Sequence, residues 1–242
     1  MNSGLARGES LPFKLGLVRT EDQFSAVCRL RTEAYGRHTE GYGDLLTTPE
    51  LMDFAPGVLV IYVQDKDSGE IVGTARLQTN SHEKLAIARG YPLPDWITTM
   101  PAAEICKFAI LPGYKYAGRQ LNKLILKACY KFCLATQISW IVIGARPGLD
   151  KAYISLGFKD LDPLAQGHLF EHGPRIKHRV LYLDVNAAER NAFESKNPVY
   201  RFMFETYHPD IELFASLSGA WQRPRFTQKA SSSLDTVFPP II

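Results

Sequence analysis

Apolar and polar residues alternate with a changing period along the chain, and each change of period marks an expected element. In the first half, a period of two indicates a strand at residues 13–17, and apolar residues at helical spacing indicate a helix at residues 21–37. An irregular stretch at residues 36–56 follows, and we expect a long surface loop of the kind that often carries function. Two apolar runs separated by a short turn then indicate an antiparallel hairpin, with strands at residues 58–65 and 70–79.

The second half opens with another irregular stretch, residues 80–99, and then returns to regular periods. A strand that leads into Pro112 and Gly113 is followed by apolar residues at i, i+3, i+4 and i+7, which indicate an amphipathic helix. The expected elements are a strand at residues 102–111, the amphipathic helix at 121–135, a buried strand at 140–145, a short helix at 149–156, a strand at 177–185 and a helical stretch at 187–217, interrupted near Pro198 and Pro209.

This order of elements predicts one α/β domain. The expected succession is β-α-β-β-β-α-β-α-β followed by a helical extension, and no internal repeat interrupts it. We place the domain at residues 12–218. Residues 223–242 have little pattern, so we expect a flexible C-terminal tail there.

The composition provides ample material for a core. Of the 242 residues, 45% are hydrophobic, including 13 Phe and 11 Tyr, so neither disulfides nor a structural metal is needed for stability. The net charge of +3 is too small to indicate nucleic-acid binding. The four cysteines form no CxxC pair, and no apolar run reaches the ~18 residues of a membrane helix. Because the N-terminus also lacks a signal-peptide pattern, we expect a cytoplasmic protein without an integral membrane segment.

The strongest local signal for chemistry is the glycine-containing turn before the amphipathic helix. Free backbone N–H groups and the positive end of the helix dipole favour a phosphate at such a turn, although a simple strand-to-helix connection is the alternative. The run KYAGRQLNKLIL, which contains Lys115, Ala117, Gly118 and Arg119, resembles the Arg/Gln-x-x-Gly-x-Gly/Ala loop of the GNAT acyltransferases.

A second motif of that family follows in the expected order. KAYISLGF, residues 151–158, resembles the family's helix that carries a Tyr, here Tyr153, ahead of Leu-Gly-Phe. The resemblance implies a GNAT-like mixed, mostly antiparallel central sheet with flanking helices and a helical C-terminal extension. It also implies that Lys115, Ala117, Gly118 and Arg119 bind the phosphate of a pantetheine donor.

Three further blocks resemble acyl-homoserine-lactone autoinducer synthases and the related long-chain N-acyl amino acid synthases. They are RLRTEAY at residues 29–35, GTARL at 73–77 and AEICKFAI at 103–110. Those enzymes share the GNAT fold and take acyl chains from acyl carrier protein. The resemblance implies site roles for Arg31, Tyr35, Arg76, Glu104 and Lys107, and for the backbone N–H groups around Phe108 to Ile110, which polarise the thioester carbonyl.

Of these two groups, the N-acyl amino acid synthases fit better. The autoinducer synthases typically carry a Trp shortly after the first block and two acidic residues for S-adenosylmethionine. The corresponding stretch GRHTEGYGD has no Trp, and Glu40 and Asp44 are its only acidic candidates.

Acyl transfer to an amine needs a base, and the departing thiolate needs a proton. Glu104 fits the base, because burial in an apolar strand raises the pKa of a carboxyl group. The alternative is an edge-strand residue paired with Lys107 or Arg76. Tyr153 fits the acid, and simple core packing is its alternative.

Arg31 and Arg76 interrupt apolar patterns, which is costly unless each charge is paired or faces a ligand. A guanidinium can bind a substrate carboxylate through two hydrogen bonds. Internal salt bridges with Glu33, Asp44 or Glu104 are the alternative.

The amphipathic helix carries a basic residue at every fourth position, namely Arg119, Lys123, Lys127 and Lys131. We expect this basic stripe on the face away from the apolar one. Beside a pantetheine site it suits an acidic carrier protein, and an ordinary solvated face is the alternative.

Together these features predict an N-acyltransferase. It would move a medium or long acyl chain from acyl carrier protein, or from acyl-CoA, to the amine of an amino acid by direct attack. The alternatives are an acyl-homoserine-lactone synthase using S-adenosylmethionine, a small-molecule N-acetyltransferase using acetyl-CoA, and an inactive acyl-binding module. Because the histidines show no metal-ligand spacing, we expect no metal, and we expect no permanently bound cofactor and no nucleic-acid partner.

Overall fold

The computed structural model describes residues 8–37, 40–114, 119–162 and 178–213, and its centre is a sheet of seven strands. The strand order is β1-β2-β3-β4-β5-β7-β6, and within the described residues only β4 and β5 run parallel. The strands are β1 (Phe13–Leu17), β2 (Val58–Asp65), β3 (Ile71–Thr79), β4 (Ala102–Ile110), β5 (Trp140–Ala145), β6 (Lys159–Asp160) and β7 (Arg179–Asp184). The helices are α1 (Glu21–Gly36), α2 (Asp95–Thr98), α3 (Arg119–Ala135), α4 (Asp150–Ser155) and α5 (Ala188–Glu194).

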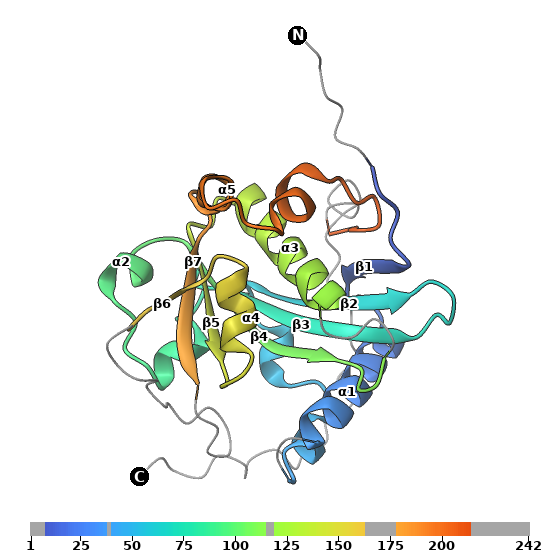
Figure 1. The fold of residues 1–242 in the computed structure, drawn as a ribbon. Coiled ribbons are helices and arrows are strands. Elements are labelled where there is room, and N and C mark those ends of the chain that lie inside the picture. Colours follow the sequence, from blue (N-terminus) through green and yellow to red (C-terminus); the bar gives the residue numbers. More distant parts are fainter. Residues whose placement is uncertain (1–7, 38–39, 115–118, 163–177, 214–242) are drawn as a thin grey trace.

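Helices cover both faces of the sheet (Figure 1). On one face α1 packs mainly against β3 and β4, and its Val27 belongs to the same buried cluster as Val60 of β2. On the other face α3 packs against the alternate residues of the same strands, so that Leu124 and Ile61 belong to the main core. The predicted mixed, mostly antiparallel sheet with flanking helices is confirmed.

The two stretches predicted to be irregular contain short helical turns. Residues 36–56 include η1 (Gly43–Leu46) and η2 (Leu51–Phe54), and residues 80–99 include η3 (Ala86–Arg89) and α2. Both stretches begin and end at elements of the sheet or at α1, so they lie where their side chains can reach the sheet.

The helical prediction for residues 187–217 is only partly correct. After α5 the chain forms one π-helical turn, η4 (Arg201–Glu205), and then leaves the helix. Tyr207 forms an isolated bridge with Gly8, and Ile211 forms one with Leu15 of β1. The edge of β1 offers unpaired backbone groups, and pairing with them competes with helix formation here. The two-residue strand β6 was also not predicted.

Strands β4 and β5 pair along only part of their length. Residues 102–105 of β4 pair with residues 140–143 of β5, and the strands are unpaired beyond that point. Between Cys106 and Ala109, β4 also contains one residue more than the facing part of β3, which is a β-bulge. The bulge and the unpaired edge lie on the same stretch of β4.

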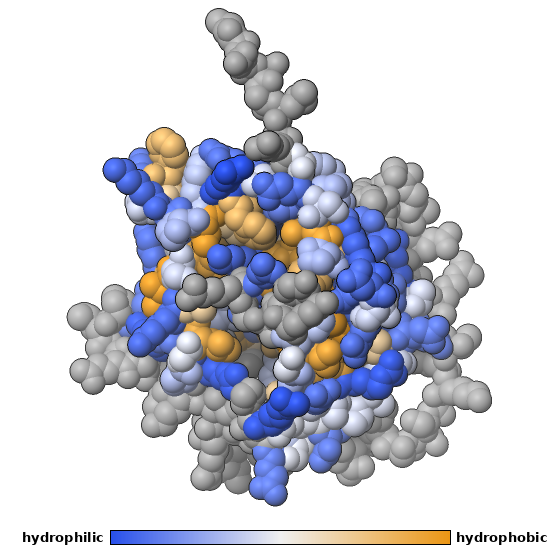
Figure 2. Space-filling view, turned by 45° about the vertical axis from the view of Figure 1, so that its right-hand side comes forward, coloured by the Kyte–Doolittle hydropathy of each residue, from blue (hydrophilic) through white to orange (hydrophobic). Residues whose placement is uncertain are grey.

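The face drawn in Figure 2 is largely hydrophilic, with apolar side chains gathered near its centre. Among the described helices, none combines the length and the apolar character needed to cross a membrane. The tail predicted at residues 223–242 lies outside the described residues.

One lysine of α3 is fully buried. Lys127 was predicted to lie on a solvent-facing stripe with Lys123 and Lys131, but it is 0% exposed. Its ammonium donates hydrogen bonds to the backbone oxygens of Phe202 and Thr206, the latter at 2.6 Å. Burial lowers the pKa of Lys127 to about 8. The predicted stripe is therefore broken at this position, because the segment after α5 packs over α3.

We predict that the variant Lys127→Met loses a pH dependence of stability. From about pH 8 to 10.5 the unfolded chain holds a proton on Lys127 that the folded chain has released, so this group makes the free energy of unfolding rise with pH. Urea titrations across this window should show the rise in the wild type and in Lys123→Met, which serves as the control on the same helix. The same rise in Lys127→Met would contradict the assignment.

Candidate active site

Glu104 lies in the middle of the sheet, on a strand with neighbours on both sides. It is opposite Gln78 of β3 and Val142 of β5, so the alternative of an edge-strand position is wrong. Glu104 is 2% exposed, and one of its carboxylate oxygens accepts a hydrogen bond from the backbone N–H of Ile87 at 2.7 Å. Burial raises the pKa of Glu104, while the Ile87 N–H and the charge of Arg76 lower it. The net effect is a pKa of Glu104 above that of a free carboxyl group.

Three predicted cations come together in a cluster with two carboxylates. Arg31 of α1 pairs with Asp53 at 2.9 Å. Arg76 of β3 pairs with Glu50 at 3.0 Å and with Asp53 at 3.4 Å, and Lys107 of β4 pairs with Glu50 at 3.1 Å. Internal salt bridges therefore form at both arginines, but with carboxylates other than the predicted ones.

The carboxylates named from the sequence lie elsewhere. Glu33 pairs with Arg37 on the surface, and Asp44 is exposed in η1. The sequence reasoning missed Glu50 and Asp53. A signal for Asp53 was present, because it interrupts the apolar run LMDFA in the same way that Arg31 interrupts the pattern of its helix.

The loop between α1 and β2 folds inward because of these charges. The side chain of Asp53 is fully buried, and it accepts a hydrogen bond from the backbone N–H of Glu50 at 3.0 Å, which closes the turn at η2. Within the described residues, Nε and Nη2 of Arg31 are buried without a hydrogen-bond partner. The cluster thus has three cations, two carboxylates and donors still unused.

The bulge in β4 is centred on Lys107. Its φ of 49° lies in the left-handed region, which costs a residue with a side chain of order 1–3 kcal/mol. The Lys107 ammonium donates to the Tyr42 hydroxyl at 2.8 Å and pairs with Glu50, and the Tyr35 hydroxyl donates to the backbone oxygen of Phe108 at 3.2 Å. Contacts from α1 and the following loop therefore hold the bulge in place.

Beyond the bulge, β4 presents a backbone donor on its open side. Leu111 donates its N–H to Val72 of β3, and alternate residues of a strand donate to opposite sides. The N–H of Ile110 therefore points towards the β5 side. Since pairing with β5 ends at Ile105, this donor faces an edge without a partner strand in the described structure.

Tyr153 of α4 lies beside this open edge. Its ring contacts that of Phe108, with centroids 6.4 Å apart, and that of Phe158 at 5.8 Å. Tyr153 is 7% exposed, and burial raises its pKa, so the phenol keeps its proton at neutral pH. The salt bridge between Asp150 and Arg179, at 3.0 Å, ties the start of α4 to β7.

Part of the predicted site lies outside the described residues. This applies to Lys115, Ala117 and Gly118, and Arg119 is described only as the first residue of α3. Phosphate binding by this turn stays a prediction. Among the described residues, no group of three or more His, Cys, Asp or Glu side chains is placed to hold a metal ion.

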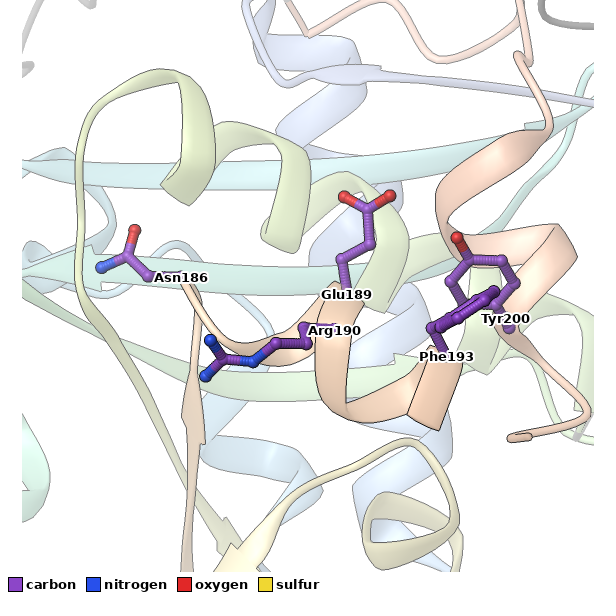
Figure 3. A pocket seen from close by; sticks show the side chains of 5 residues that line it. All are labelled: Asn186, Glu189, Arg190, Phe193 and Tyr200. Atoms are coloured by element: carbon purple, nitrogen blue, oxygen red, sulfur yellow. The ribbon is translucent and has the colours of Figure 1, made fainter. Parts of the chain in front are cut away.

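Surface hollows lie around α5. One of about 440 Å³ is lined by Asn186, Glu189, Arg190, Phe193 and Tyr200. Figure 3 shows the rings of Phe193 and Tyr200 side by side, with centroids 5.5 Å apart. Phe193 is 65% exposed and lines this outer hollow.

No protein-family model matches the chain, and no curated protein matches its sequence. Solved structures resemble it. The N-acyl amino acid synthase FeeM, from uncultured soil microbes, has a TM-score of 0.61 and 18% identity, over 79% of this chain and 97% of FeeM. The CoA-dependent acyl-homoserine lactone synthase BjaI, solved with S-adenosylmethionine and isopentyl-CoA, has a TM-score of 0.52 and 15% identity, over 81% of this chain and 93% of BjaI.

A third structure gives the wider class. It is a putative acetyltransferase of the GNAT family from Desulfovibrio desulfuricans, with a TM-score of 0.50 and 14% identity, over 72% of this chain and 99% of that protein. At these identities the likeness concerns the fold. The chain has the GNAT acyltransferase fold, as the resemblance of its motifs implied.

We predict that Asp53→Asn destabilises the protein by about 3–5 kcal/mol, because it leaves Arg31 buried without a counter-charge. Urea unfolding at neutral pH measures the loss. The matched control Glu33→Gln removes only an exposed ion pair and should change the free energy of unfolding by less than about 1 kcal/mol. Equal stability of the two variants would show that the buried pair does not hold the loop.

Proposed function

We propose that this protein is an N-acyltransferase that moves a medium or long fatty acyl chain from acyl carrier protein, or from acyl-CoA, to the amine of an amino acid. The main support is the position of Glu104, buried on a central strand that leads into a bulge with an open edge. The likeness to FeeM, an N-acyl amino acid synthase, favours the same reaction class.

The reaction divides among three groups of atoms. Glu104 takes a proton from the ammonium of the acceptor, and the free amine attacks the carbonyl carbon of the thioester. The N–H groups of Phe108 and Ile110 stabilise the negative oxygen of the tetrahedral intermediate. When the C–S bond breaks, Tyr153 gives its proton to the sulfur. The nitrogen of the intermediate loses its second proton, which restores the phenol of Tyr153, so that an amide and a thiol are the products.

The cation cluster suits the carboxylate of the acceptor. Arg31, Arg76 and Lys107 carry three positive charges against two negative charges on Glu50 and Asp53. Once Glu104 has taken the proton it is neutral, and a substrate carboxylate then balances the third cation. A planar guanidinium also matches a carboxylate geometrically, so Arg76→Lys is not a conservative change.

The pantetheine arm of either donor would lie along the open edge of β4, with its phosphate at the turn that the sequence predicts at residues 115–119. Acyl carrier protein would dock through Arg119, Lys123 and Lys131. Lys127 takes no part in that surface, because it is buried. BjaI is CoA-dependent, so acyl-CoA remains the alternative donor.

We predict that cells producing the wild type accumulate N-acyl amino acids and that cells producing Glu104→Gln do not, because the amide cannot take the proton. Mass spectrometry of lipid extracts measures both, with Glu33→Gln as the active control and circular dichroism as the check of folding. Homoserine lactones in the extract would instead identify an autoinducer synthase. No new product with any variant would direct attention to acetyl-CoA turnover and then to acyl binding without catalysis.

We predict that Tyr153→Phe lowers kcat by about 10²-fold or more with natural thioesters, because the thiolate then leaves without a proton. A donor with an aryl thiol leaving group, which departs readily as the anion, should restore most of the rate. The matched control is Tyr130→Phe. Tyr130 is a buried tyrosine of α3 that packs against Phe204 of η4. Equal losses with both donors would assign Tyr153 to packing alone.

A further inference from the structure

A glutamine lies next to Glu104 on the adjacent strand. Gln78 of β3 is the cross-strand partner of Glu104, and both residues are 2% exposed. Their chain neighbours Leu77 and Ile105 belong to the core under α3. Because side chains alternate along a strand, Gln78 and Glu104 therefore lie together on the opposite face.

These two side chains hold the segment that begins η3. The amide of Gln78 donates to the backbone oxygen of Lys84 at 3.1 Å and accepts from the N–H of Ala86 at 3.1 Å. The next N–H along the chain, that of Ile87, donates to Glu104 at 2.7 Å. Gln78 thus fixes the backbone on both sides of Leu85, and this placement aims the Ile87 N–H at the carboxylate.

The hydrogen bond from Ile87 has a chemical consequence for Glu104. A buried carboxyl group favours its neutral form, and a backbone N–H directed at the carboxylate favours the charged form. It also holds one oxygen in place, which limits rotation of the group. A base must be ionised and oriented before the acceptor can lose its proton to it.

We propose that Gln78 is a positioning residue for the base of the reaction. It acts through the backbone of residues 84–87, and it keeps Glu104 ionised and oriented without contacting the substrate. This role rests on the proposed function of Glu104 as the base. The glutamine amide is needed as both donor and acceptor, so neither an apolar residue nor a carboxylate can replace it.

The test compares Gln78→Met with Asn80→Ala. Methionine keeps the length and volume of glutamine but cannot make the two hydrogen bonds. Asn80 is the matched control, because it holds the other end of the same excursion in the same manner, with bonds to the oxygen of Met100 at 2.8 Å and from the N–H of Ala102 at 2.9 Å. Asn80 has no link to Ile87 or Glu104 through these bonds.

We expect Gln78→Met to move the acidic limb of the pH profile of kcat/KM upward by about one pH unit, which is about a tenfold loss of rate at acid pH. The rate at alkaline pH should be largely retained. Asn80→Ala should keep the wild-type limb even if it lowers stability. A wild-type limb in Gln78→Met would overturn the proposal.

A readout without catalysis separates this inference from the function on which it rests. Carboxyl ¹³C NMR can follow the titration of Glu104, whose signal is assigned by its absence in Glu104→Gln. If the titration shifts in Gln78→Met and the wild type shows no acyltransfer, the role of Gln78 is supported and the proposed function is refuted. An unshifted titration would refute the role of Gln78 even in an active enzyme. If Gln78→Met does not fold, Gln78→Ala is measured in the same way.

Discussion

Two guanidinium groups withdrawn from water organise this site, because each needs a counter-charge inside the protein. Arg31 is 1% exposed and Arg76 is 6% exposed. Asp53 contacts both of them, so it joins α1, the sheet and the loop between them. If the loop left the sheet, Arg31 and Arg76 would lose the carboxylates that balance their charges. The same loop brings Glu50 to Lys107, so one electrostatic requirement also supports the bulge in β4.

The bulge and the end of pairing with β5 interrupt the ladder of β4. An unbroken ladder would use every N–H of this strand in pairing. The extra residue at Lys107 and the end of pairing at Ile105 leave the N–H of Ile110 facing an open edge. The strain of the left-handed Lys107 is compensated by its contacts with Tyr42 and Glu50. Strain of this kind is found where function requires a particular backbone geometry.

Both irregular stretches of the chain end at the same face of the sheet, and they have different effects. The stretch before β2 supplies negative charge to the cations. The stretch before β4 supplies a neutral hydrogen-bond donor, the Ile87 N–H, to Glu104. Burial raises the pKa of Glu104, and the Ile87 N–H and the charges of Arg76 and Arg89 lower it.

The sequence by itself determined most of the order of the elements and, through the resemblance of its motifs, the mixed fold. It also singled out Arg31, Arg76 and Glu104 within apolar segments and, by resemblance, Lys107. These are local properties, because period and interruption can be read within one segment. Only the tertiary structure decided which charges meet. Asp53, Glu50 and Gln78 come from segments whose pattern says nothing of their partners, and Lys127 fits a solvent-facing period yet is buried by the segment that follows α5. Pairing and burial depend on contacts between distant parts of the chain, which hydrophobic periodicity does not encode.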